Sequence, residues 1–143
     1  SQQSQRYVAA STPEYVLPPS IEKDPEKKKS FEKAVKGLYR LYSGLLEDGV
    51  PAEDSRYLLP NAACTKIMVT MNARELIHFF KLRCCERAQW EIRDMATRML
   101  KTAKTAAPFI FKDCGPACVT GPCSEGAMTC GRPKEIRERF KGL

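Results

Sequence analysis

The basic side chains are the groups in this sequence best suited to binding or stabilising negative charge. Among them, the position of Arg83 is the most informative. In a helix expected over 72–84, Arg83 falls on the apolar side of a helical wheel, near Phe80. A guanidinium is unfavourable on an apolar face unless it is paired. Arg83 should therefore extend outward at the helix end, pair with Glu86 or Glu91, or bind an anion or a carbonyl group.

The opposite side of the same helix carries a polar stripe. Arg74 and His78 lie one turn apart there, together with Lys81. Such a stripe is either a solvated surface or a face that meets an anionic ligand. His78 is the single histidine of the chain, which excludes a metal site with two histidines and leaves one imidazole for acid–base chemistry.

Seven cysteines raise the question of a metal site or disulfides. Four of them follow the spacing C-x3-C-x4-C-x6-C among glycines: Cys114, Cys118, Cys123 and Cys130. Zinc sites usually show tighter pairs in two halves, and an odd number of cysteines without a secretory signal argues against a disulfide framework. We expect free thiols and no metal, with a four-thiolate zinc site as the alternative. The adjacent Cys84 and Cys85 are expected to be packing residues.

Composition sets wider limits. The 143 residues are 43% hydrophobic and 29% charged, which indicates one globular domain or a piece of a larger one. No apolar run reaches the ~20 residues of a membrane span, and no signal peptide opens the sequence. We therefore expect a cytoplasmic protein that does not bind membranes. The net charge of +7 favours an anionic partner: a nucleic acid, a nucleotide or a phosphorylated cofactor.

Helices must position most of these side chains. Asp24 before Pro25 and Asn72 before Glu75 are helix-start signals, and apolar residues recur at helical spacing after both. The predicted helices cover about 25–48, 72–84 and 88–104. A short helix follows Pro51. The other predictions are an extended or looped segment over 8–25, a strand or extended segment over 64–70, a glycine-rich loop after 108 and a short closing helix over 132–143.

Several motifs resemble those of the flavin-dependent thymidylate synthases, the ThyX family. The strongest is T-M-N-A-R-E-L-I-H-F-F-K-L-R, residues 70–83, which is followed by A-Q-W-E-I-R, residues 88–93. The segment S-R-Y-L-L-P, residues 55–60, is similar to the family's arginine shortly before Leu-Pro. The opening S-Q-Q-S-Q-R-Y is similar to the end of the family motif R-H-R-x-x-S-x-x-x-x-S-x-R-Y.

The resemblance implies a fold and a division of the chain. We expect an α+β fold with few strands, the mainly helical C-terminal part of a ThyX-like domain, over 1–108. A Cys/Gly-rich tail with a short basic terminal helix would follow over 109–143. The R-H-R triplet and the N-terminal half of the family would precede Ser1, so this truncated chain is expected to be a C-terminal portion that is inactive alone.

The resemblance also implies an activity and its partners. Family members are FAD-dependent methyltransferases that make dTMP from dUMP, with methylenetetrahydrofolate as the carbon donor and NADPH as the reductant. They form homotetramers with shared active sites, in which partner chains would partly bury Phe79, Phe80 and Trp90. They use no protein nucleophile, which agrees with the absence of a recognisable Cys/His pair here.

Site residues follow from the matched motifs. Arg83 would hold the uracil carbonyl edge and stabilise charge on the ring as the catalytic arginine. The other dUMP-binding residues would be Gln2, Ser4, Arg6 and Arg56, with both arginines near the phosphate and sugar. FAD would contact Asn72, Arg74, His78 and Leu82. Gln2 stands where the family usually has a glutamate, which removes a carboxylate near the nucleotide.

Two other classes of function compete with this interpretation. A basic nucleic-acid-binding module would fit the charge and the basic residues after 131, but aromatic residues are only 8% and show no stacking pattern. A non-catalytic helical piece used for oligomerisation would fit the helices. The resemblance favours an enzyme that binds no nucleic acid.

Overall fold

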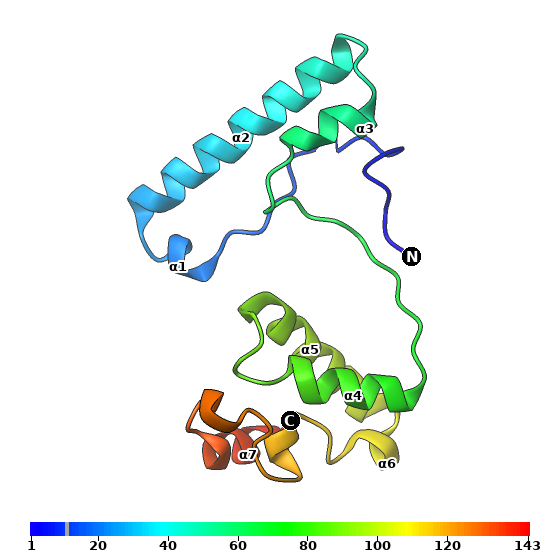
Figure 1. Ribbon diagram of the computed structural model, residues 1–143, viewed down its shortest axis with the longest axis vertical. Coiled ribbons are helices and arrows are strands. Elements are labelled where there is room, and N and C mark those ends of the chain that lie inside the picture. Colours follow the sequence, from blue (N-terminus) through cyan, green and yellow to red (C-terminus); the bar gives the residue numbers. More distant parts are fainter. Residues whose placement is uncertain (11) are drawn as a thin grey trace. The chain divides into compact units, whose positions relative to one another are not determined.

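The protein is mainly helical. The computed structural model describes residues 1–10 and 12–143, and its chain forms two compact units, Ser1–Val69 and Thr70–Leu143 (Figure 1). The first unit contains α1 (Pro19–Glu22), α2 (Pro25–Glu47), α3 (Ala52–Ser55) and the 3-10 turn η1 (Arg56–Leu58). The second contains α4 (Ala73–Arg83), α5 (Trp90–Ala106), α6 (Pro108–Phe111), η2 (Ala117–Val119), η3 (Gly126–Met128) and α7 (Pro133–Lys141).

The long helix α2 organises the first unit. Asp24 caps its start by accepting hydrogen bonds from the backbone N–H groups of Glu26 and Lys27, and Gly49 follows its end with a φ of +83°. One face of α2 buries Val35, Tyr39 and Tyr42, which are spaced by four and three residues. The expected helix over 25–48 is therefore confirmed.

The two buried tyrosines attach the N-terminal segment to α2. The Tyr39 hydroxyl donates a hydrogen bond to the carbonyl of Glu14 at 2.9 Å, and the backbone N–H of Ala10 donates to the Tyr42 hydroxyl at 3.0 Å. These bonds satisfy polar atoms that burial would otherwise leave without water. The segment around the predicted nucleotide-binding residues is thus held by the helix.

Residues 64–70, expected to be a strand or an extended segment, are extended. Residues 1–3 pair antiparallel with 66–68, and residues 14–16 pair antiparallel with 62–64. Each pairing contains one isolated bridge, Gln2 with Ile67 and Tyr15 with Ala63. No strand forms among the described residues, because the pairing consists of two separated bridges. A second difference is α1, a single helical turn within the segment expected to be extended or looped; Pro19 begins it with a fixed φ.

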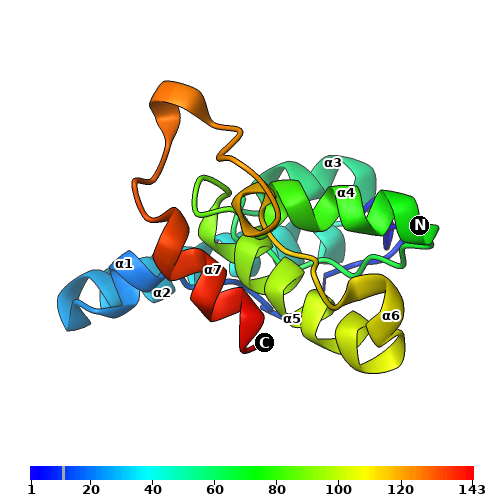
Figure 2. The same ribbon diagram turned by 90° about the horizontal axis from the view of Figure 1, so that it is seen from below.

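The second unit packs α4, α5 and the tail around one core. Phe80 and Cys84 of the α4 region meet Ala96 and Leu100 of α5. The tail completes this core with Phe111, Cys118, Ile136 and Phe140. Figure 2 shows α7 beside α5, where the Lys104 ammonium donates to the carbonyl of Phe140 at 2.7 Å. Residues on both sides of position 108 therefore share a core; the division at 108/109 stays a prediction.

Close packing also explains a glycine in the tail. A Cβ atom at Gly115 would lie 2.9 Å from Cγ2 of Val119 and 3.0 Å from Cδ1 of Phe140. Both neighbours belong to packed elements of the second unit, so a larger side chain would force them apart.

The remaining helix predictions agree with the structure. α4 and α5 confirm the helices expected over 72–84 and 88–104, and α7 confirms the closing helix. The short helix after Pro51 is found as α3 and η1, and it ends before Pro60. Within the described part of the chain, no helix has both the length and the apolar character that crossing a membrane requires.

Candidate functional site

The predicted nucleotide-binding residues near the N-terminus lie on a short antiparallel pairing and the turn that follows it. The Gln2 amide donates to the Thr65 hydroxyl at 3.3 Å, beside the bridge to Ile67. The Ser4 hydroxyl accepts from the backbone N–H of Arg6 at 3.2 Å, and the backbone N–H of Val8 donates to the Ser4 carbonyl at 3.0 Å. The turn fixes Ser4 and Arg6 next to each other.

Glu53 brings two predicted phosphate-binding arginines to one place. Its carboxylate pairs with Nε of Arg6, and its backbone carbonyl accepts from Nε of Arg56 at 3.0 Å. The Arg6 guanidinium also lies 5.1 Å from the centre of the Tyr7 ring. Both arginines use Nε within the protein, so their terminal N–H groups can reach an anion. The sequence analysis assigned no site role to Glu53; the available signal was its position in α3, three residues before Arg56.

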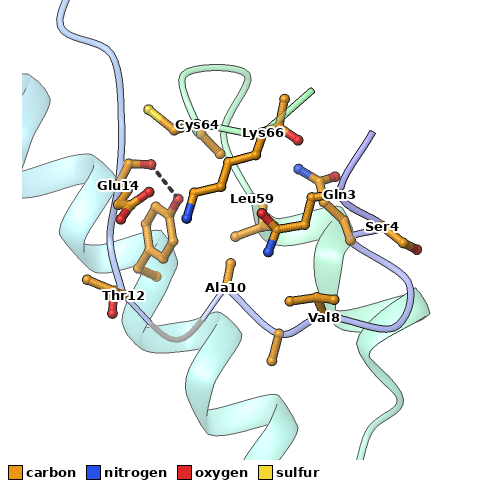
Figure 3. Close-up of a pocket in the computed structure, with 14 residues that line it drawn as sticks. Gln3, Ser4, Val8, Ala10, Thr12, Glu14, Leu59, Cys64 and Lys66 are labelled. Atoms are coloured by element: carbon orange, nitrogen blue, oxygen red, sulfur yellow. Dashed lines mark hydrogen bonds between the residues drawn. The ribbon is translucent and has the colours of Figure 1, made fainter. Parts of the chain in front are cut away.

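A cavity of about 180 Å³ opens beside this turn (Figure 3). Ser4 and Tyr39 line it, and the Lys66 side chain extends across it toward Glu14. Burial raises the pKa of the Tyr39 hydroxyl, with smaller contributions from neighbouring acidic groups. The cavity therefore offers a cation and a neutral hydroxyl next to one of the residues predicted to bind dUMP.

The predicted FAD-binding residues lie on α4 in the second unit. The Asn72 side chain caps this helix, because its Oδ1 accepts from the backbone N–H of Glu75 at 2.9 Å. Arg74 and His78 are exposed, and Leu82 is 48% exposed. The polar stripe is thus accessible, and the Asn72 amide N–H group remains able to donate to a ligand.

Arg83 is the last residue of α4 and is exposed. It forms no ion pair within the described part of the chain, so the alternative of a pairing with Glu86 or Glu91 is not found. The Glu86 carboxylate instead forms ion pairs with other arginines. Because α4 ends at Arg83, the positive charge of this side chain suits the helix C-terminus. Its guanidinium is available to a ligand.

Glu86 is the most strongly held carboxylate of the second unit. Its side chain is 11% exposed and lies within 2.6 Å of Arg139, 3.2 Å of Arg132 and 3.4 Å of Arg93. Burial acts to raise the pKa of Glu86, but the hydrogen bond from Arg139 and the charges of all three arginines outweigh it, so that pKa is lowered. From the sequence, Glu86 was expected only as a possible partner of Arg83.

The cysteines divide between packing and the tail loop. Cys84 is fully buried, as expected of a packing residue, and burial raises its pKa to about 11. Cys85 instead approaches Glu125, with Sγ 3.9 Å from Oε1. The tail thiols of Cys114, Cys118, Cys123 and Cys130 are free, and burial raises the pKa of Cys114 and Cys118. In the described residues no group of three metal-ligating side chains is placed to hold a metal ion.

Partner chains are not needed to bury one of the aromatic residues expected at subunit contacts. Phe80 is fully buried within its own unit, against Phe79 at 6.0 Å and Phe111 at 6.1 Å between ring centres. The tail supplies Phe111, which explains why a helical wheel of 72–84 alone did not show this partner. Phe79 and Trp90 are partly buried.

Comparison with known proteins shows which family this chain resembles. Residues 1–109 match the family described as thymidylate synthase complementing protein. A relative from Geobacter sulfurreducens, named flavin-dependent thymidylate synthase, is 56% identical over 145 residues, covering 100% of this chain and 62% of the relative. One of the same name from Clostridium tetani is 44% identical over 156 residues, covering 98% and 63%. The chain thus spans about three-fifths of the length of these relatives.

Proposed function

Because the chain belongs to the family described as thymidylate synthase complementing protein, we propose that the complete protein makes dTMP from dUMP as a flavin-dependent thymidylate synthase. Methylenetetrahydrofolate is the carbon donor and NADPH the reductant in this proposal, and the enzyme acts in the cytoplasm. The observation that carries it is the family match over 1–109, which contains every predicted site residue. The α+β fold of a ThyX-like domain belongs to the same proposal.

The first unit supplies the dUMP phosphate and sugar contacts. Arg6 and Arg56 meet at Glu53 with their terminal N–H groups available, and two arginines of this kind suit the planar, bidentate recognition of a phosphate. Ser4 presents its hydroxyl from the adjoining turn. Gln2, as a neutral amide, can donate to a nucleotide oxygen and accept from a nucleotide N–H group.

The second unit supplies Arg83 for the pyrimidine. A guanidinium without a carboxylate partner keeps its full charge for a ligand, and a positive charge fixed at the uracil carbonyl edge stabilises negative charge as it develops on the ring. Exposure at the end of α4 supports this role.

The donor set on α4 fits FAD. Arg74 and His78 form an exposed stripe that suits the pyrophosphate, the Asn72 amide can donate to the dinucleotide, and Leu82 offers an apolar contact. When bound, FAD supplies the hydride for the methyl group of dTMP. The chain's own residues hold the two anionic ligands and orient them.

Binding of both ligands by the complete protein tests this function. We expect flavin absorbance in the purified protein and a spectral shift that saturates as dUMP is added. DNA at equal phosphate concentration should give no comparable shift. Salt-sensitive DNA binding without nucleotide preference would instead support the nucleic-acid-binding alternative, and a folded protein that binds neither FAD nor dUMP would support a non-catalytic helical piece.

Assembly belongs to the same proposal. We propose a homotetramer whose active sites are shared between chains, with Phe79 and Trp90 at or near subunit contacts. Their partial exposure in the second unit supports this placement. Sedimentation of the complete protein should show a tetramer; a monomer at high protein concentration would contradict the assembly while leaving the chemistry open to assay.

A further inference from the structure

Glu86 joins three elements of the second unit through one carboxylate. Arg93 lies in the first turn of α5, Arg132 immediately precedes α7, and Arg139 lies within α7. The distances from their guanidinium nitrogens to the carboxylate oxygens are 3.4, 3.2 and 2.6 Å. Arg93 also donates to the Glu86 backbone carbonyl at 2.9 Å. We call this group the Glu86 clamp.

The Glu86 clamp is the charged contact between the turn after α4 and the tail. Other bonds hold the tail together: Arg137 donates to the carbonyls of Cys118 and Gly121 at 2.6 and 3.0 Å. Lys104 donates to the Phe140 carbonyl and joins α7 to α5. Cys85 also reaches the tail, with its Sγ 3.9 Å from Oε1 of Glu125. In the described chain the clamp supplies the ion pairs of the turn that follows Arg83, and these charged contacts tie that turn to the tail.

Arg83 needs such support from its surroundings. Its guanidinium has no carboxylate partner in the described structure, and Glu86 lies three residues further along the chain, past the C-cap residue Cys84. A charge that acts on a substrate must be held close to its productive position, because small displacements weaken the interaction strongly. The Glu86 carboxylate is engaged by three other arginines, so it does not compete with a ligand for Arg83.

We propose that Glu86 is a positioning residue for Arg83: its carboxylate anchors the turn after α4 to α7, and the C-terminal tail thereby holds the Arg83 guanidinium in place for the pyrimidine of the nucleotide. This inference rests on the proposed function. The inference also assigns a function to the tail, most of which lies beyond the family match over residues 1–109. The tail acts through the turn and does not touch the substrate.

The test compares Glu86→Gln with Glu138→Gln in the complete protein. Glu138 pairs with Lys141 at the exposed surface of α7, so its variant removes a carboxylate without disturbing the clamp. Two measurements are made. The first is the rate at which an alkylating reagent labels the buried thiol of Cys84, which reports on docking of the tail. The second is the separate KM for dUMP and for NADPH.

We expect Glu86→Gln to label Cys84 at least about tenfold faster and to raise the KM for dUMP about tenfold, with the KM for NADPH unchanged. Glu86→Asp should recover part of both effects, and Glu138→Gln should match the wild type. If Glu86→Gln does not fold, Arg139→Gln removes one of the three ion pairs and should shift both measurements in the same direction by a smaller factor.

Three results would overturn the inference in different ways. Faster labelling of Cys84 with an unchanged KM for dUMP would show that the clamp docks the tail without positioning Arg83. Unchanged labelling and kinetics would show that the clamp does neither. A wild-type protein without dUMP-dependent turnover would instead overturn the proposed function and the role of Glu86 in it, and the labelling rates would still show whether the clamp docks the tail.

Discussion

Single side chains show how the same residue can serve the fold and a ligand. Asn72 caps α4 through Oδ1, and its amide N–H group is the part proposed to meet FAD. Arg6 pairs with Glu53 through Nε, and its terminal N–H groups are the part proposed to meet phosphate. Variants that separate the two functions of a side chain are therefore the most informative ones.

Arg83→Ala tests the proposed contact with the pyrimidine. We expect dUMP-dependent activity to fall about ten- to a hundredfold, because a charge-assisted hydrogen bond in a closed site is worth about 1.5–3 kcal/mol. The control is Arg98→Ala, which removes an exposed pair with Asp94 at 2.9 Å and should leave activity nearly unchanged. Steady-state kinetics with dUMP measure both variants. Equal, small losses of activity would show that Arg83 does not contact the substrate.

Asn72 separates helix capping from cofactor binding. Asn72→Ala should lower the free energy of unfolding by about 1 kcal/mol through loss of the cap and should also weaken FAD binding. Asn72→Asp keeps the capping oxygen, so stability should be retained while FAD affinity falls, because a carboxylate replaces the amide next to an anionic ligand. Denaturant unfolding and flavin titration measure the two effects. Unchanged FAD affinity in Asn72→Asp would show that Asn72 caps α4 but does not bind FAD.

The lowered pKa of Glu86 predicts a definite pH dependence. A carboxyl whose pKa is lower in the folded state stabilises the protein above its ordinary pKa of 4.5, and that contribution is lost as pH falls through the lowered value. Glu86→Gln should therefore lower the free energy of unfolding by about 1–3 kcal/mol at pH 7, and the difference from wild type should shrink as pH is lowered toward 3. Urea unfolding over this range measures it; a difference that stays constant with pH would contradict the ionic origin.

Helices and turns show where sequence reasoning succeeds and where it stops. Local signals were sufficient for α2, α4 and α5, since a cap, a proline or a glycine marks their ends and one face repeats at helical spacing. The burial of Tyr39 was missed, although it lies one turn from Val35. The three arginines around Glu86 were also missed, because two of them lie 46 and 53 residues away. Long-range pairing leaves no local pattern to read.

The tail is an element whose packing can be tested directly. Gly115→Ala should lower the free energy of unfolding by about 1–3 kcal/mol, since the added methyl group meets Val119 and Phe140 in a filled core. Gly121→Ala is the matched control, because its Cβ would come no closer than 3.8 Å to the carbonyl of Ala117. Thermal or urea unfolding of both variants gives the comparison. Equal stability would mean that the tail does not pack closely on the core.

Across the whole chain, the two compact units divide the proposed ligands. The first holds the residues assigned to the phosphate and sugar of dUMP, and the second holds those assigned to FAD and the pyrimidine. The motifs 55–60, 70–83 and 88–93 were enough to suggest the family from sequence, because each resembles a family motif over several consecutive residues. The role of the tail could not be anticipated in this way, since its contacts with α4 and α5 depend on packing.

Formation of dTMP is the measurement that tests the central claim most directly. The complete protein is incubated with dUMP, methylenetetrahydrofolate, NADPH and FAD, and the nucleotides are identified by mass spectrometry. We predict that dTMP accumulates over many turnovers, that omission of FAD from protein stripped of flavin abolishes it, and that Arg83→Ala reduces it strongly. A folded protein that binds FAD and dUMP but forms no dTMP under these conditions would contradict the proposed activity.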